Sequence, residues 1–221
     1  MSVYYKIVSE KISWFNHKYE LGKTYKCDGD LEFNRVGFHC YKNPLYGLNM
    51  FPFEGELFEV EIGSEYIEKD NVTISRSFKP VRKITGTERN RLLTGHVYDE
   101  NTGRETWFIN GKLHRDQDKP AFIWYSVSKK SNQKSKYWYQ NGELHREGDQ
   151  PAVITSAGTQ EWYKHGKRHR DGDNPAVITY NGIRRWYKNG VLHREGNPAV
   201  ILNDDVKFWF LNGELIKPVE N

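Results

Sequence analysis

Residues 138–154 read WYQNGELHREGDQPAVI, and residues 162–178 read WYKHGKRHRDGDNPAVI. Further copies of this phrase start at Trp107 and Trp186, and a shortened copy starts at Trp209. The five tryptophans are spaced by 31, 24, 24 and 23 residues. A fixed period of this length indicates a repeat architecture, in which each unit buries its apolar side against its neighbours. We therefore expect about five repeats over residues 95–217.

Each copy of the phrase predicts strands joined by a tight turn. Asn-Gly stands at 110–111, 141–142, 189–190 and 212–213, and His165-Gly166 takes the same place in the third copy. Both central residues of a type I′ hairpin turn have positive φ, which Asn and Gly tolerate. No segment of this half has the 3.6-residue apolar period of a helix. One period is therefore predicted to be an antiparallel hairpin plus a short connecting arm.

Each tryptophan is followed directly by a second aromatic residue. Neighbours on a strand face opposite sides of a sheet, so the two aromatic rows should separate. The second row is Phe108, Tyr139, Tyr163, Tyr187 and Phe210. We expect the tryptophan row to be the core and the tyrosine row to be more exposed, because Tyr can leave its hydroxyl in water.

The polar stretch between the two strands has two interpretations. In the structural one, Gly148 permits a bend, Pro151 starts the next strand, and His145 and Arg146 bond carboxylates and carbonyls at the corner. In the other, histidines that recur once per period bind metal; these are His114, His145, His169 and His193. Successive histidines would lie roughly 9–10 Å apart, given the strand spacing, whereas all ligands of a zinc ion lie about 2 Å from it. A site within one repeat, made of a histidine and the acids two and four residues on, stays possible, although calcium usually needs more oxygen ligands. We expect neither a metal nor a cofactor.

The composition limits the class of protein. The chain has 221 residues, and 14% of them are aromatic. Disordered chains are poor in aromatic residues, so this composition indicates a folded protein. Residues 1–85 hold as many basic as acidic side chains, so the net charge of +4 lies in residues 86–221. So small a surplus argues against specific nucleic-acid binding. With no apolar run of membrane-spanning length and no signal-peptide pattern, we expect a cytoplasmic protein with free thiols at Cys27 and Cys40.

Residues 1–85 do not repeat and read as a small α+β domain, joined to the array by residues 86–94. Strands are predicted over 4–8, 36–40, 56–62 and 71–77. Residues 43–50 read as a short helix, with Asn43 as N-cap and Pro44 at its first position. The fold class is therefore mainly β: a small α+β N-terminal module followed by an antiparallel β-hairpin repeat array.

The phrase WYKNG-LHREG-PAV resembles a repeat of uncharacterised proteins of large DNA viruses, phages and some bacteria. It is more distantly similar to MORN repeats, which share the aromatic-x-Asn-Gly hairpin but carry Gly-x-Gly where this chain has His-Arg-acid. The N-terminal GFHCYKNPL at 37–45 and LFEVEI at 57–62 resemble an uncharacterised N-terminal domain of phage and large-virus proteins. The MORN-like resemblance implies a non-catalytic binding scaffold. The viral resemblance implies a protein acting on a host or viral macromolecule in the host cytoplasm.

Two other functions stay open. The strand–helix–strand order of the first domain loosely resembles ADP-ribosyltransferases, in which case Glu59 and Glu61 are the possible catalytic acids. Such enzymes need Arg or His on the first strand, where this chain has Tyr4, Tyr5 and Lys6. The second alternative is sequestration of a small nucleotide signal. His39 and Cys40 are neighbours on a predicted strand and point opposite ways, so we expect no nucleophilic pair there.

The candidate binding site follows from the long interval after Trp107. Its extra residues fall in SVSKKSNQKSKY, 126–137, which contains four lysines and no acid. This segment is either a solvated loop or a contact for an anionic partner, namely a protein or a phosphate-bearing ligand. The residues predicted for that contact are Lys129, Lys130, Lys134, Lys136, Tyr139, Tyr163, Tyr187, Arg146 and Arg170.

Overall fold

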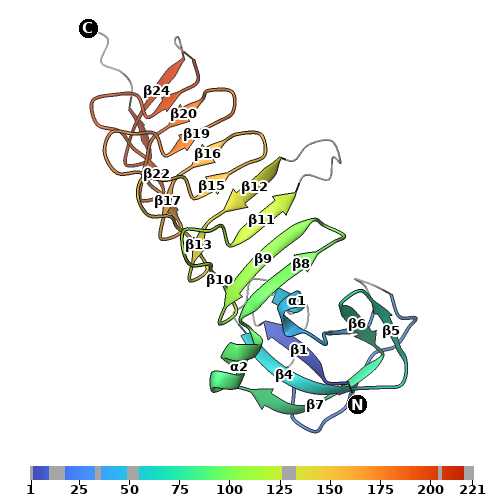
Figure 1. Ribbon diagram of the computed structural model, residues 1–221. Helices are drawn as coiled ribbons and strands as arrows, with labels where there is room; N and C mark the ends of the chain where they lie inside the picture. The colour runs from blue at the N-terminus through green and yellow to red at the C-terminus, as the bar shows by residue number, and fades with distance from the viewer. Residues whose placement is uncertain are drawn as a thin grey trace. The chain divides into compact units, whose positions relative to one another are not determined.

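The computed structural model describes residues 2–9, 18–32, 36–48, 55–125, 133–203 and 206–216 (Figure 1). The chain divides into two compact units. The N-terminal unit comprises Met1–Val97 with Phe108–Lys112, and the repeat unit comprises Tyr98–Trp107 with Leu113–Asn221. Within the described ranges, no helix has the length and apolar character needed to span a bilayer. The fold is mainly β with antiparallel hairpins, as the sequence predicts.

The described residues of the N-terminal unit form two antiparallel sheets and two short helices. The first sheet has the order β1 (Tyr4–Ser9), β4 (Gly55–Ile62), β7 (Ser77–Ile84), β2 (Tyr25–Lys26). The second has the order β3 (Phe38–Cys40), β6 (Val72–Ser75), β5 (Tyr66–Lys69). The helices are α1 (Pro44–Leu48) and α2 (Gly86–Leu92). The residues predicted as a linker thus form α2, and Asn43 accepts a hydrogen bond from the Leu45 N–H at 3.0 Å as an N-cap does.

Both faces of the first sheet carry buried side chains, and its aromatic cluster lies on one of them. Phe58 and Val60 of β4 pack there with Phe78 of β7, and Ile62 is half-buried against them. The alternation predicted for residues 56–62 therefore places its apolar side chains as expected. Cys40 is fully buried in the same cluster, and both cysteines are free thiols.

The repeat unit is built on one long antiparallel sheet. Its strands follow the order β9 (Arg104–Ile109), β11 (Phe122–Tyr125), β12 (Lys134–Tyr137), β15 (Val153–Ile154), β16 (Gln160–Glu161), β19 (Val177–Ile178), β20 (Arg184–Arg185), β23 (Val200–Ile201), β24 (Lys207–Leu211). β8 (Gly95–Asp99) and β10 (Lys112–Leu113) both pair with β9, and β25 (Glu214–Ile216) pairs with β24.

Separate two-stranded hairpins accompany the sheet along its length (Figure 1). They are β13 (Tyr139–Gln140) with β14 (Glu143–Leu144), β17 (Tyr163–Lys164) with β18 (Lys167–Arg168), and β21 (Tyr187–Lys188) with β22 (Val191–Leu192). A middle repeat therefore supplies two strands to the sheet and one hairpin outside it. The hairpin-plus-arm prediction was too simple, because the connecting arm itself forms sheet strands.

The chain changes layer at the tryptophan. The Trp138 N–H donates to the Ala152 carbonyl at 2.8 Å, while the Trp138 carbonyl accepts from the His145 N–H at 3.1 Å. Trp162 and Trp186 make the same pair of bonds with the equivalent residues. The expectation that Trp and Tyr are adjacent on one strand is thus wrong for these repeats, since Trp stands between two strands that belong to different sheets.

Burial of the middle repeats follows the prediction. Trp138, Trp162 and Trp186 are 6–7% exposed, and the tyrosines that follow them are half-buried. The first repeat is reversed, since Phe108 is buried and Trp107 is half-buried. The five predicted turns are confirmed: the first turn residue has φ of 48–54° and the glycine φ of 75–93° in every copy.

Candidate functional site

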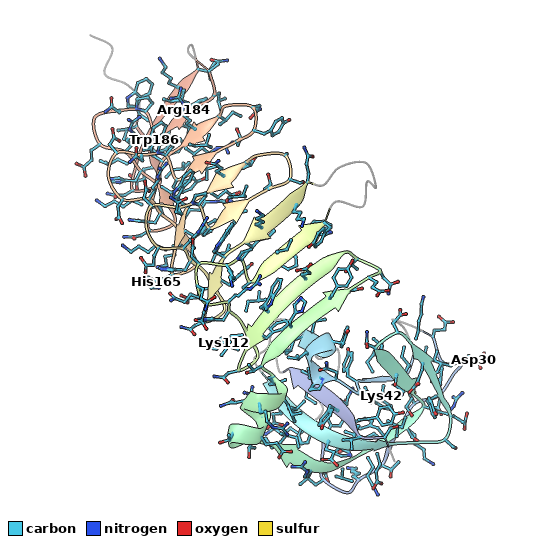
Figure 2. The ribbon with its side chains drawn as sticks, in the orientation of Figure 1. Asp30, Lys42, Lys112, His165, Arg184 and Trp186 are labelled. Atoms are coloured by element: carbon cyan, nitrogen blue, oxygen red, sulfur yellow. The ribbon has the colours of Figure 1, made fainter. Side chains whose placement is uncertain are left out.

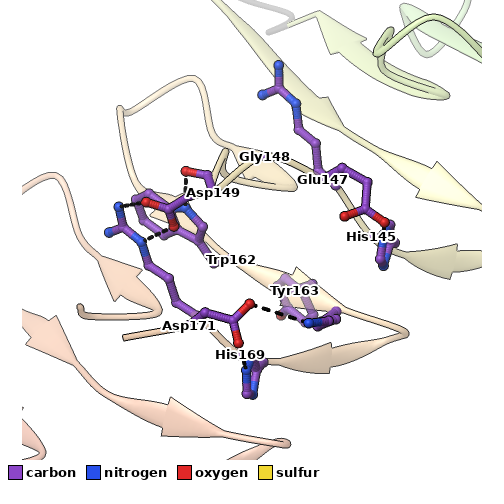
Figure 3. Close-up of a pocket in the computed structure, with 11 residues that line it drawn as sticks. His145, Glu147, Gly148, Asp149, Trp162, Tyr163, His169 and Asp171 are labelled. Carbon is purple, nitrogen blue, oxygen red and sulfur yellow. Dashed lines mark hydrogen bonds and ion pairs between the residues drawn. The ribbon is translucent and has the colours of Figure 1, made fainter. Parts of the chain in front are cut away.

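The polar corner of each repeat is bonded to the next repeat (Figure 3). The Arg170 guanidinium donates twice to the Asp149 carboxylate of the preceding repeat, at 2.7 and 2.9 Å. It also lies 3.9 Å from the centre of the Trp162 ring and donates to the Pro175 carbonyl at 3.3 Å. The Trp162 indole N–H donates to the Asp149 carbonyl at 3.0 Å. One aspartate is thereby held through both its side chain and its backbone.

Neighbouring corners repeat this arrangement. Arg146 donates to Asp118 at 2.7 and 2.8 Å, and Arg194 to Asp173 at 2.6 and 2.7 Å. Each guanidinium again stacks 3.9 Å from the tryptophan of its own repeat. The paired arginine lowers the pKa of each aspartate below its ordinary value. We call this set of Arg, Asp and Trp residues, with the adjacent His, the corner ladder.

The corner histidines use both ring nitrogens. The Nδ1 of His145 accepts the backbone N–H of His165, in the turn of the next repeat, at 3.2 Å. The Nε2 lies 2.8 Å from Glu147, and it must carry the proton because Nδ1 accepts a hydrogen bond. His114, His169 and His193 make equivalent contacts: Nδ1 accepts the backbone N–H of Asn141, Asn189 and Asn212 respectively, and Nε2 lies beside Asp116, Asp171 and Glu195. The structural interpretation of the His-Arg-acid phrase is confirmed by these contacts.

Grooves lie between successive corners. One of about 80 Å³ is lined by the corners that contain His145 and His169. The next, of about 360 Å³, is lined by those that contain His169 and His193. Arg146 and Arg170, which the sequence suggested as anion contacts, are both bonded to aspartates of the preceding repeat.

The three predicted tyrosines lie on the hairpins, with half-buried side chains. The Tyr163 hydroxyl donates to Glu161 at 3.0 Å, and burial first, then the nearby Glu161 charge, raises the pKa of Tyr163 to about 12. Burial also raises the pKa of Tyr139. Arg168 lies over both Tyr163 and Tyr187, at 5.7 and 5.5 Å from the ring centres.

The predicted lysines divide into two groups. Lys129 and Lys130 lie outside the described residues. Lys134 and Lys136 are exposed on sheet strand β12, and Lys134 lies 4.5 Å from the Tyr125 ring centre. The tyrosines sit on β13, β17 and β21, which belong to other sheets. Among the described residues, no hydrogen bond or ring contact joins these lysines to the three tyrosines.

Lys136 belongs instead to a row of side chains that crosses the sheet. Directly paired residues of an antiparallel sheet point to the same face. The pairing runs without a register shift from Ile123 of β11 through Lys136 of β12 to Lys207 of β24. We call this the outer row: Ile123, Lys136, Ile154, Gln160, Ile178, Arg184, Ile201 and Lys207. Figure 2 labels Arg184 on the sheet and His165 at a hairpin turn.

The opposite face carries the more buried row. Its members are Phe122, Tyr137, Val153, Glu161, Val177, Arg185, Val200 and Phe208. The three valines are 4–7% exposed, whereas the four polar side chains of the outer row are exposed and its isoleucines half-buried. The outer row therefore alternates isoleucine with a long polar side chain, strand by strand.

Sequence reasoning identified only Lys136 of the outer row. A signal for the rest exists, because the polar members all stand two residues before a tryptophan and the isoleucines all follow a phrase Pro-Ala-Val or Pro-Ala-Phe. Among the described residues, no ion pair or side-chain hydrogen bond engages Lys136, Arg184 or Lys207. The outer row thus presents unused cations, whereas the corner ladder does not.

The N-terminal unit places its possible catalytic acids in ion pairs. Glu59 bonds Arg82 at 2.7 Å, and Glu61 bonds Lys79. The Lys6 amine lies 5.2 and 5.7 Å from the ring centres of Phe78 and Phe38, donates to the His39 carbonyl at 3.2 Å, and has its pKa lowered by burial. Both glutamates and the Lys6 amine are therefore bonded to other groups of the N-terminal unit.

Residues 2–89 match a protein family described as a domain of unknown function, DUF7666. Neither a curated protein nor a solved structure matches the chain. The match falls within the N-terminal unit and does not include the corner ladder or the outer row.

Proposed function

We propose that the chain is a non-catalytic binding protein whose repeat unit recognises an anionic macromolecule through the outer row. The observation that carries this proposal is the regular alternation of half-buried isoleucine with exposed Lys136, Arg184 and Lys207. Cations on exposed rims raise association rates and fix register, while adjacent apolar groups supply burial on binding.

The contrast with the corner ladder supports this assignment. There the cations are bonded to aspartates within the array, so they have little to offer a ligand. The resemblance to phage and large-virus repeat proteins extends the proposal to a host or viral macromolecule as the partner, bound in the cytoplasm.

The test compares two variants of equal charge. The outer-row variant is Lys136→Ser, Arg184→Ser and Lys207→Ser; the control changes three exposed lysines elsewhere in the repeat unit, Lys119, Lys167 and Lys188, to Ser. Each protein is immobilised at matched density, and captured proteins from the native cell are quantified by mass spectrometry at low and high salt.

We expect one partner to be lost by the outer-row variant, retained by the control, and weakened by salt in the wild type. Equal capture by all three proteins would reject the proposal. Hydrolysis or transfer of NAD by the purified chain would instead favour an ADP-ribosyltransferase-like enzyme. A nucleotide that raises the melting temperature without turnover would favour sequestration of a small signal.

A further inference from the structure

We infer that the outer row binds an acidic amphipathic α-helix of its partner, laid along the repeat axis. This inference rests on the proposed function and names the secondary structure and the residue pattern of the ligand. Three properties of the outer row carry it: its spacing, its width and its charge.

The spacing follows from the strand order. Neighbouring strands lie about 4.8 Å apart, so like members of the row recur every two strands, at about 9.6 Å. From Ile123 to Ile201, the isoleucines keep this alternation through three periods. The row is therefore a periodic array of alternating apolar and polar side chains, about 29 Å long from Ile123 to Ile201.

The spacing of side chains on an α-helix matches the period of the outer row better than the spacing on an extended chain does. A helix rises about 1.5 Å per residue, so seven residues span about 10.5 Å, and residues three and four apart on one face fall near the half-period. In an extended strand, side chains on one face recur at about 6.8 Å and lose register with the row after a single contact. A helix of about 20 residues would cover the row from end to end.

The width of the row favours a single rod rather than a second sheet. Sheet strands β15, β16, β19, β20 and β23 are each two residues long, so the regular pairing forms a stripe. A second sheet packed on the stripe would bury its cations, which is costly without partners. Beside a helix about 10 Å wide, Lys and Arg can lay their stems on the apolar face and keep their charges at its rim.

The charge of the row selects the ligand sequence. Lys136, Arg184 and Lys207 are basic and Gln160 is neutral, whereas Glu105, which pairs with Ile123 at the first end of the row, accepts a hydrogen bond from the Tyr125 hydroxyl. The polar positions from Lys136 onward therefore call for carboxylates on the partner. The isoleucines between them call for aliphatic side chains. The matching helix therefore carries Glu or Asp every seventh residue, with Leu or Ile three or four residues after each acid.

A designed peptide tests the inference directly. The probe is a 24-residue peptide with Glu every seventh residue, Leu between them on the same face, and Ala and Gln elsewhere. Its controls are a peptide with the same residues at a five-residue period, about 7.5 Å on a helix, a scrambled peptide, and a single-stranded oligonucleotide of equal charge. Binding to the full chain is measured by fluorescence anisotropy.

We expect the seven-residue peptide to bind at least about tenfold more tightly than either peptide control, a difference of about 1.4 kcal/mol. The outer-row variant, and separately Ile154→Thr with Ile178→Thr, should each remove most of this preference, while the variant at Lys119, Lys167 and Lys188 should retain it. Equal binding of the five-residue peptide, or tighter binding of the oligonucleotide, would overturn the helix assignment. If that happens while the outer-row variant still loses its cellular partner, the proposed binding function stands and the helix inference alone is wrong.

Discussion

The corner ladder and the outer row recur in the same repeats, yet they use their side chains differently. At the corner, His-Arg recurs in four copies and the aspartate in three, and bonds such as His145–His165 and Arg170–Asp149 join adjoining repeats. In the outer row, the isoleucines stay constant while the polar position changes from Lys to Gln to Arg to Lys. Positions that are constant and bonded build the array, whereas a position that varies without a bonding partner is free to suit a ligand.

The largest expected effect comes from removing the tryptophan at the corner. Trp162→Ala should lower the free energy of unfolding by about 3–5 kcal/mol, because it empties a buried site and removes the surface on which Arg170 stacks. Trp124→Ala provides the control, with a loss expected to be less than half as large, because Trp124 is 42% exposed and Arg104 lies farther from its ring, at 5.6 Å. Urea titration of both variants measures the difference. Similar decreases in the free energy of unfolding would show that the corner tryptophan contributes no more than the tryptophan on the sheet surface.

Replacing a corner histidine should have the next largest effect. His145→Leu keeps the apolar volume but leaves the backbone N–H of His165 without its acceptor, at an expected cost of about 1–3 kcal/mol. Glu147→Gln is the matched control, because this side chain is 82% exposed and should change stability by less than about 0.5 kcal/mol. Thermal denaturation at pH 7 distinguishes them, and a neutral result for His145→Leu would show that water replaces the ring.

The Arg170–Asp149 pair should contribute less, since the aspartate side chain is 55% exposed and solvent screens the pair. A double-mutant cycle with Arg170→Met and Asp149→Asn should give a coupling of about 1 kcal/mol or less. The arginine lowers the folded pKa of Asp149, so its contribution is complete above pH about 4 and is lost as pH falls through the folded value. The stability difference between wild type and Arg170→Met should therefore shrink on acidification below pH 4; a constant difference would contradict the pairing.

One turn should gain stability. His165 has φ of 48° where the other four turns have Asn, which adopts this conformation more readily. We expect His165→Asn to raise the free energy of unfolding by about 0.5 kcal/mol. The change also removes the contact between the His145 and His165 rings, whose centres are 4.6 Å apart. A decrease in stability by urea titration would show that this ring contact outweighs the turn preference.

The smallest effect on stability is expected in the outer row. Changing Lys136, Arg184 and Lys207 to Ser should alter the free energy of unfolding by less than about 0.5 kcal/mol, since the side chains are exposed and unpaired among the described residues. Circular dichroism and urea titration measure this. A loss above about 2 kcal/mol would mean that the outer row, like the corner, serves the fold.

Local chemistry made the hairpin turns and the short helix of the N-terminal unit predictable. Asn-Gly favours the positive φ of a tight hairpin turn, and Asn43-Pro44 marks a helix start without reference to distant residues. The break at each tryptophan was missed because it depends on the pairing of Trp138 with Ala152, which strand periodicity does not record.

The Arg–Asp bonds left a signal that a comparison of the repeats could have used. Asp118, Asp149 and Asp173 each precede a repeat that contains the corner arginine. The fourth copy has Asn197 near that position, and the shortened fifth copy replaces His-Arg by Ile216-Lys217. At the junction of the fourth and fifth copies, the corner arginine that donates and the aspartate that accepts are therefore both absent from the sequence. The outer row was harder to find, because strands of two residues are too short for an alternation to be visible in sequence.

The bonds of the corner ladder also have a direction. The acceptors are the Leu144 carbonyl, His145 Nδ1 and the oxygens of Asp149; the donors, on the following repeat, are the Gly166 and His165 N–H groups, Arg170 and the Trp162 indole. The two faces of a repeat are therefore chemically different: the face toward the preceding repeat supplies donors, and the face toward the following repeat supplies oxygen and imidazole acceptors. Two such repeats can form these bonds in one order only, so the ladder fixes the polarity of stacking as well as its register.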